Sequence, residues 1–287
     1  MRISKVLKIS GVGLVSLFLL GVTGLFYSFQ NKSDSEEKTI KEMLEQGVEP
    51  TCFLMEWEDE IINTVYVGDP TKQKVLFIHG SPGDWTSWSG LMTDSSLLEN
   101  FFMISFDRPG YGNTTIDPQA DLAEHGRAAI AIMKQFGPNE KFIIAGHSYG
   151  GAVVGQVLVS APERVEKAIL AAPAISPDHQ EPRWYNKLAR LKLINMLIGN
   201  DMRSSNVEMI GLSKSLRNIE DSFPLVQTPQ VFIHGEKDIL VPYATVDYWQ
   251  SHKMPSVDYV LRADMNHFVP FSDPDLIIKA LLGIEQE

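Results

Sequence analysis

The sequence has only one cysteine, Cys52, among its 287 residues. A single cysteine excludes an intramolecular disulfide bond, and a chain of this length can bury a full hydrophobic core without one. Cys52 lies in an expected strand, and no histidine partner or oxyanion motif surrounds it. We therefore expect a small buried hydrophobic residue rather than a nucleophile.

Positive charge is also scarce, because 25 lysines and arginines stand against 36 aspartates and glutamates, a formal net charge of −11. The only charged residues before Asn31 are cations (Arg2, Lys5 and Lys8), so the remainder is more acidic still. Such a domain should be repelled by nucleic-acid phosphates, which are bound by clustered lysine and arginine. The sequence also lacks metal-ligand spacing and a phosphate-binding Gly-Lys-Ser/Thr loop. We therefore expect no nucleic-acid partner, no metal and no cofactor.

One hydrophobic run is long, since the segment from Ile9 to Phe29 contains no charged residue. At a helical rise of about 1.5 Å per residue it spans roughly the 30 Å hydrocarbon core of a bilayer. The preceding cations favour a cytoplasmic N-terminus. Residues 1–30 are thus predicted to be a single-pass anchor, with the catalytic domain on the exoplasmic side, periplasmic or extracellular. The alternative is a signal peptide, cleaved near Val22-Thr23-Gly24, and a secreted protein.

After a connector at residues 31–50, expected to be helical over 35–46, short apolar runs alternate with longer amphipathic segments. Continuously apolar runs such as VLFI and FIIA are typical of parallel strands buried on both faces. This alternation predicts an α/β fold with a mostly parallel central sheet and helices on both faces. Strands are expected at 53–57 and 61–67 (an antiparallel pair), 74–78, 101–106, 141–145, 165–170, 230–233 and 256–261, and helices at 118–136, 149–160 and 274–282.

The alternation stops at residues 175–224, which show two helical patterns, 183–198 and 205–219, and no strand. We expect a helical cap over the strand ends, inserted between two parts of the core domain, 51–174 and 225–287. The apolar faces of both helices should mainly pack against the core. The first helix is rich in cations, which we hypothesise to lie near anionic lipid headgroups, a solvated face being the alternative: Arg183, Lys187, Arg190 and Lys192.

A G-x-S-x-G motif, Gly146-His147-Ser148-Tyr149-Gly150, directly follows an apolar strand and opens a helical run. That setting is what a nucleophile elbow requires. The flanking glycines permit a sharp turn that presents the Ser148 hydroxyl at the end of the strand. We predict Ser148 as a nucleophile; the alternative is a glycine-rich turn that only packs closely.

From about residue 53 to 282 the chain resembles the α/β-hydrolase fold family, and in style its capped esterases and proline iminopeptidases. Four motifs in the family's order carry the resemblance: His79–Gly83, Asp107–Gly112, the elbow, and an acid followed by a histidine near the end. The resemblance implies an oxyanion hole made by the backbone N–H groups of Tyr149 and Ser81. Pro82 has no N–H and cannot contribute.

Of the seven histidines, only His267 follows the last strand and supports the chain order serine, acid, histidine. It matches the family's general base. Asp238, in Gly235-Glu236-Lys237-Asp238, matches the family's acid, which orients the imidazole and stabilises the imidazolium. Glu236 is a rival acid and Asp264 a weaker one.

These residues predict a serine hydrolase that cleaves carboxylic esters, lipid-like ones included, through an acyl-enzyme intermediate. The alternatives are an aminopeptidase or amidase, or a carbon–carbon bond hydrolase, on the same triad. Ser81 weakens the peptidase alternative, because proline-releasing aminopeptidases of the family usually have a second glycine there. A catalytically silent, membrane-tethered binding protein is a third alternative.

Overall fold

The structure is a computed structural model that describes residues 32–285. The predicted membrane segment, Ile9 to Phe29, lies outside these residues. Within the part described, no helix is long and apolar enough to cross a membrane. The connector forms the helix α2 (Lys32–Glu45), whose Met43 is buried in the core.

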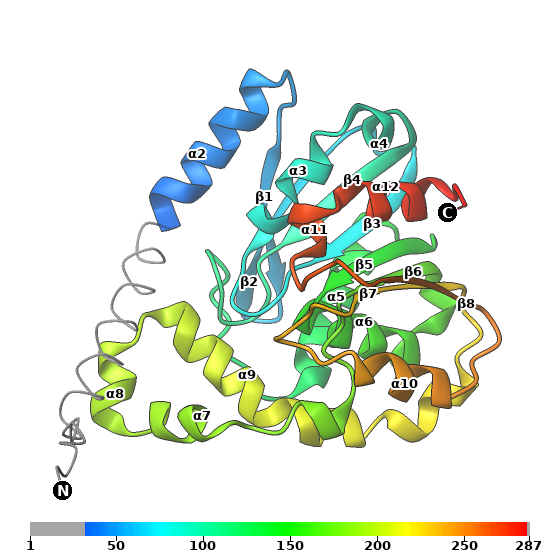
Figure 1. Ribbon diagram of the computed structural model, residues 1–287. Helices are drawn as coiled ribbons and strands as arrows, with labels where there is room; N and C mark the ends of the chain where they lie inside the picture. Colours follow the sequence, from blue (N-terminus) through cyan, green and yellow to red (C-terminus); the bar gives the residue numbers. More distant parts are fainter. Residues whose placement is uncertain (1–31, 286–287) are drawn as a thin grey trace, which may run out of the picture.

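An eight-stranded sheet lies at the centre of the molecule, in the order β1-β2-β4-β3-β5-β6-β7-β8 (Figure 1). β2 is antiparallel to both β1 and β4, and every other neighbouring pair is parallel. The predicted mostly parallel sheet with its antiparallel opening pair is confirmed. The strands are β1 (Thr51–Trp57), β2 (Glu60–Val67), β3 (Gln73–Ile78), β4 (Phe101–Phe106), β5 (Phe142–His147), β6 (Val165–Ala171), β7 (Gln230–Gly235) and β8 (Val257–Arg262).

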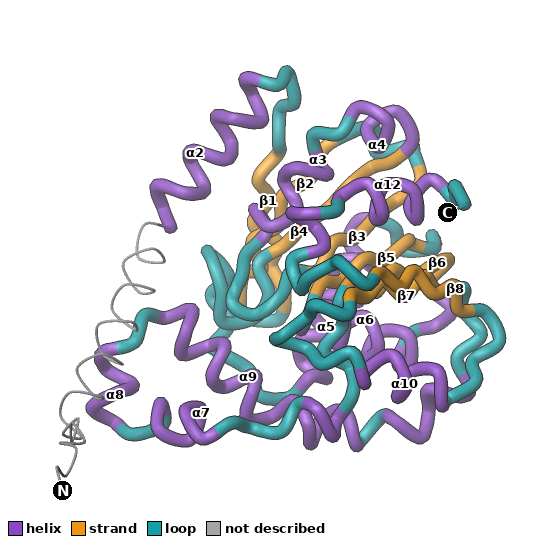
Figure 2. The backbone as a smooth tube through the Cα atoms, viewed as in Figure 1, coloured by secondary structure: helices purple, strands orange, loops and turns teal. Residues whose placement is uncertain are grey.

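The central strands are buried on both faces, because alternate side chains enter two separate cores. In β3, Leu76 and Ile78 join one core, whereas Val75 and Phe77 join the other. Covering both faces with helices is what allows a continuously apolar strand. Figures 1 and 2 show the two helical layers. One core includes α5 (Leu122–Phe136), α6 (Tyr149–Ser160) and α10 (Ala244–Ser251), and the other α3 (Ser89–Met92), α4 (Ser95–Asn100) and α12 (Pro274–Leu282).

The cap contains three helices, α7 (Trp184–Ala189), α8 (Lys192–Leu197) and α9 (Asn200–Arg217). The single helix predicted over 183–198 is therefore two short ones. α9 packs on α5 and buries Leu212 and Leu216 as expected, whereas α7 packs on α9 and forms an outer layer. The expectation that the first cap helix buries its apolar face is wrong, since Trp184 is 64% and Leu191 55% exposed.

Cys52 is exposed, so the expectation of a buried thiol is also wrong. β1 is an edge strand, in which Met55 faces the core while Cys52 and Leu54 face outward. A strand covered on one face buries only alternate residues. Partial burial, together with the carboxylates of Glu36 and Asp107, raises the pKa of the Cys52 thiol.

Candidate active site

Ser148 occupies the turn between β5 and α6, with the backbone angles φ 54° and ψ −118°. L-residues avoid positive φ, and such strained positions cluster at functional sites. The turn is fixed by the Ser148 N–H, which donates to Ala171 O (3.0 Å), and by the Ser148 carbonyl, which accepts from Gly151 and Ala174 (2.9 Å each). The strand–turn–helix geometry expected of the G-x-S-x-G motif is present.

The glycines on either side of Ser148 are required by close backbone contacts. A Cβ on Gly146 would lie 2.3 Å from Gly150 O, and one on Gly150 would lie 2.1 Å from Ile78 O. Gly80, in the predicted oxyanion segment, approaches the serine itself, because its Cβ would lie 3.2 Å from Ser148 Cβ. The elbow and the segment after β3 are thus packed against each other at the position that the sequence predicts.

His267 and Asp238 meet, although 29 positions separate them, because β7 and β8 are parallel neighbours and both residues follow the carboxyl ends of these strands. His267 Nδ1 lies 2.6 Å from Asp238 Oδ2. The other carboxylate oxygen, Oδ1, accepts from the N–H groups of Leu240 (2.9 Å) and Val241 (2.8 Å). The rival acids, Glu236 and Asp264, are exposed.

The environment of Asp238 favours its ionised form. Burial alone raises the pKa of this carboxyl, but the hydrogen bond and charge of His267, with the two backbone N–H groups, outweigh burial and lower the pKa below its ordinary value. An ionised carboxylate can only accept a hydrogen bond, so the nitrogen that faces it must donate one. In a neutral His267 the proton therefore lies on Nδ1. Nε2 is then the free basic nitrogen, as a general base requires.

His147 connects the elbow with the loop that carries His267. Its Nε2 lies 2.8 Å from His267 O, and the two imidazole rings are 4.9 Å apart between centroids. Burial, with a smaller contribution from His267, lowers the pKa of His147 to about 3. His147 is therefore neutral and donates from Nε2 to the His267 carbonyl. Because His147 precedes Ser148 in the chain, this bond holds His267 beside the elbow.

The two predicted oxyanion donors lie on the elbow and on the segment that faces it. Tyr149 is the first residue of α6, and N–H groups in the first turn have no partner within their helix. Ser81 follows Gly80, the residue that packs against Ser148. The Ser81 hydroxyl points elsewhere, to Tyr111 OH at 3.0 Å.

Sequence reasoning missed a buried ion pair behind this segment. Arg108 and Glu208 are fully buried and hydrogen-bonded to each other, and Tyr111 OH donates to Glu208 Oε2 (2.6 Å). Burial raises the pKa of Glu208, although the Arg108 guanidinium opposes the shift. A signal was available in the cap, because Glu208 precedes the buried Leu212 and Leu216 at four-residue intervals, where an apolar residue is expected.

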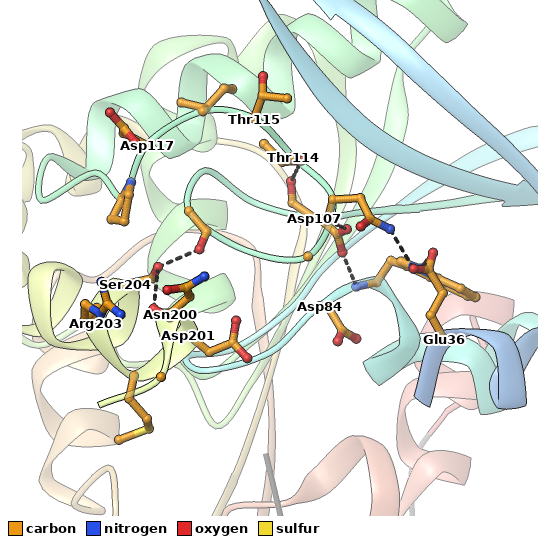
Figure 3. Close-up of a pocket in the computed structure, with 18 of the residues that line it drawn as sticks. Glu36, Asp84, Asp107, Thr114, Thr115, Asp117, Asn200, Asp201, Arg203 and Ser204 are labelled. Carbon is orange, nitrogen blue, oxygen red and sulfur yellow. Dashed lines mark hydrogen bonds between the residues drawn. The ribbon is translucent and has the colours of Figure 1, made fainter. Parts of the chain in front are cut away.

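The structure also contains a polar cavity of about 1080 Å³ between α2, the turn after β4 and the start of α9. Figure 3 shows its carboxylates, from Glu36, Asp84, Asp107, Asp117 and Asp201. Asp107 is held by Asn63 Nδ2 and by the N–H groups of Trp85 and Asn113, and burial raises its pKa to about 6. None of the predicted triad residues lines this cavity, so we assign it no part in the chemistry.

Exposed apolar side chains lie beside the acid and the base. Ile239 (86% exposed) and Leu240 (46%) follow Asp238, and Phe268 (52%) follows His267. The cap reaches this region, because Arg183, at the start of α7, donates to Leu240 O (3.5 Å). We call Ile239, Leu240 and Phe268, with the exposed Trp184 of α7, the apolar rim.

Comparison with known proteins gives partial and full-length relatives. The chain is 33% identical over 104 residues to a dihydrolipoyllysine-residue acetyltransferase component of an acetoin cleaving system from Cupriavidus necator, covering 35% of this chain and 26% of that protein. It is 33% identical over 246 residues to a pFDCC methylesterase from Arabidopsis thaliana, covering 72% of this chain and 92% of the relative. The chain spans only 26% to 32% of the length of the first curated relatives that it matches.

A solved structure and a family model agree with the fold. The crystal structure of a membrane phospholipase A, described as a bacterial virulence factor, superimposes with a TM-score of 0.66 at 16% identity, covering 95% of this chain and 96% of that one. An identity this low shows a shared fold and no more. The model of the alpha/beta hydrolase family matches residues 75–280. The chain belongs to the alpha/beta hydrolase family.

Proposed function

We propose that the protein is a serine hydrolase of carboxylic esters, with Ser148 as nucleophile, His267 as general base and Asp238 as the orienting acid. The observation that carries the proposal is the 2.6 Å contact between His267 Nδ1 and the buried Asp238, with the His267 carbonyl bound by His147, the residue before the elbow serine. A serine hydroxyl is a weak nucleophile until a base takes its proton. The free Nε2 of His267 supplies that base.

The reaction would run in two steps through the same groups. Ser148 Oγ attacks the ester carbonyl carbon while His267 Nε2 takes the hydroxyl proton, and the N–H groups of Ser81 and Tyr149 stabilise the oxyanion. The alcohol leaves with the proton from Nε2, which forms the acyl-enzyme. Water then attacks the acyl carbon and gives a proton to Nε2, and the acid leaves as Ser148 Oγ is reprotonated.

Two observations favour an ester over an N-terminal peptide substrate. The family's N-terminal peptidases usually bind the substrate amine with acidic residues of the cap, whereas the fully buried acid of this cap, Glu208, is ion-paired with Arg108. The apolar rim suits an acyl or alcohol chain instead, since burying apolar surface stabilises binding. The methylesterase relative supports ester chemistry as well.

Fluorophosphonate labelling tests the proposal. We expect the unmodified protein to label and Ser148→Ala to remain unlabelled, with hydrolysis of short and long p-nitrophenyl esters and little hydrolysis of aminoacyl amides. An unmodified, folded protein that neither labels nor turns over would favour a silent binding protein. Preferential cleavage of the amides would instead support the peptidase alternative.

We further propose that residues 1–30 anchor the enzyme and that the catalytic domain faces an exoplasmic compartment. The uncharged run from Ile9 to Phe29 supports the anchor, and the exposed Trp184, Leu188 and Arg190 of the cap suit a nearby lipid surface.

The full chain should stay with membranes at high salt and alkaline pH. The protein from Lys32 onward should float with anionic liposomes more than with neutral ones. Release of the full chain by alkali would contradict the proposed anchor. Equal flotation with both kinds of liposome would contradict the proposed contact of the cap with anionic lipid.

A further inference from the structure

Buried side chains hold the predicted oxyanion segment from behind. The His79 imidazole lies with Nδ1 2.7 Å from Gly80 O, and Arg108 binds the same carbonyl and that of His79. Arg108 lies in the turn after β4 and is fully buried. Its Nε donates to His79 O (3.0 Å), and one terminal nitrogen donates to Gly80 O (2.9 Å). Its guanidinium also stacks over the ring of Tyr149, 4.6 Å from the centroid. Arg108 thus contacts both chain segments that carry the proposed oxyanion donors.

The bond to Gly80 O has a direct consequence for the Ser81 N–H. The carbonyl of Gly80 and the amide of Ser81 belong to one planar peptide group, which is trans. In a trans peptide the C=O and the N–H point in opposite directions. A donor that fixes the Gly80 carbonyl therefore fixes the direction in which the Ser81 N–H points.

Arg108 is in turn held by the cap. Both carboxylate oxygens of Glu208, on α9, accept from the Arg108 guanidinium. Oε2 also accepts from Tyr111 OH (2.6 Å), whose oxygen lies 3.0 Å from Ser81 Oγ. Glu208 therefore reaches the Ser81 residue by two routes, through the Gly80 carbonyl and through the Ser81 side chain. We call Arg108, Tyr111 and Glu208 the clamp.

We propose that Glu208 is a positioning residue through which the cap sets the geometry of the oxyanion hole. This inference rests on the proposed function. Glu208 does not reach the ester; it holds Arg108 and Tyr111, which hold the peptide that presents the Ser81 N–H. The oxyanion forms only as the ester carbonyl is attacked, so a misdirected donor weakens the transition state more than the bound substrate.

The test compares Glu208→Gln and Tyr111→Phe with a matched control on the same helix. Asn206 is buried on α9 and accepts from Asn186 Nδ2 (3.0 Å), a contact within the cap. Asn206→Ala therefore disturbs buried polar packing of the cap and leaves the clamp intact. Each variant is assayed with a p-nitrophenyl ester for kcat and KM, with a trifluoromethyl ketone as an oxyanion-forming inhibitor, and by thermal unfolding.

We expect Glu208→Gln to lower kcat about 10- to 100-fold, less than the loss of a whole oxyanion donor, with KM changed less than about threefold. Inhibition by the ketone should weaken in proportion to kcat. Tyr111→Phe should lower kcat about 3- to 10-fold, again with little change in KM. Asn206→Ala should keep the kcat of the unmodified protein even if its unfolding temperature falls.

Folded Glu208→Gln with unchanged kcat overturns the inference, and so does an equal loss of kcat in Asn206→Ala. If Glu208→Gln fails to fold, Tyr111→Phe decides: unchanged kcat and ketone inhibition overturn the inference, and a parallel loss of both supports it. Failure of the unmodified protein to label with a fluorophosphonate would instead contradict the proposed function, so the two failures are distinguishable.

Discussion

Two neighbours hold the imidazole of His267 in place, Asp238 on Nδ1 and His147 on the backbone carbonyl. The sequence predicted both Asp238 and His267 from their positions after the last two strands. It could not predict the clamp, because Glu208 meets Arg108 across 100 positions. Local sequence patterns describe contacts along an element, whereas this pairing depends on how the cap seats on the core.

The carboxylate of Asp238 should be essential for activity. Asp238→Asn presents an amide to Nδ1, which favours the wrong tautomer of His267, so we expect kcat to fall about 10⁴-fold, as in other Ser-His-Asp triads. Steady-state kinetics on a p-nitrophenyl ester measures this loss. Glu236→Gln is the matched control and should retain full activity. A loss in Glu236→Gln comparable to that in Asp238→Asn would move the acid role away from Asp238.

The neutral His147 should make the fold sensitive to acid. Its pKa is about 3 in the folded protein and about 6.5 when unfolded, so between these values the unfolded chain binds more protons. Stability therefore rises with pH across this window and is lost as pH falls below about 6.5, by at most about 1.4 kcal/mol per pH unit. His147→Gln keeps a donor for the His267 carbonyl and removes the titration. Denaturant unfolding of both proteins from pH 7 to pH 4 should show the advantage of the unmodified protein shrinking; a constant difference would contradict the pKa.

At the scale of elements, strands were easier to predict than cap helices. The central strands alternate between two cores, and this burial left the continuous apolar runs that marked them. With the edge strands, which bury fewer residues, all eight lie within about two residues of the predicted bounds. The break between α7 and α8 was missed, because the periodic apolar residues continue across it. Four of those side chains are exposed, so their periodicity reflects mainly a surface rather than packing against the core: Trp184, Leu188, Leu191 and Leu197.

The elbow stores strain that belongs to the β5–α6 turn rather than to the serine side chain. At φ 54° and ψ −118° an L-residue costs about 1–3 kcal/mol. Glycine adopts these angles without that cost but loses about 0.5–1 kcal/mol of chain entropy. We therefore expect the free energy of unfolding of Ser148→Gly to equal that of Ser148→Ala or to exceed it by up to about 2 kcal/mol. The unfolding temperature of the glycine variant should then be equal or higher. Calorimetry of the two inactive variants decides, and a less stable glycine variant would mean that the turn is relaxed.

At the scale of the whole molecule, the sheet brings together residues that are distant in the chain. Ser148 follows β5, Asp238 follows β7 and His267 follows β8, all at the carboxyl edge of parallel strands. Ligands of open α/β sheets bind at this edge. The mostly parallel sheet and the helical insertion could be expected from the sequence and the family resemblance. The apolar rim could not be expected from the sequence, because it depends on which side chains the cap leaves uncovered.

The central claim is that Ser148 becomes acylated during turnover, and peptide mapping of the acid-quenched enzyme tests it most directly. During hydrolysis of a p-nitrophenyl ester, the account predicts an acyl group on the peptide that contains Ser148, and none in Ser148→Ala. The modification should accumulate with a burst of p-nitrophenol. Turnover of the ester with the acyl group on another residue, or with Ser148→Ala as active as the unmodified protein, would contradict it.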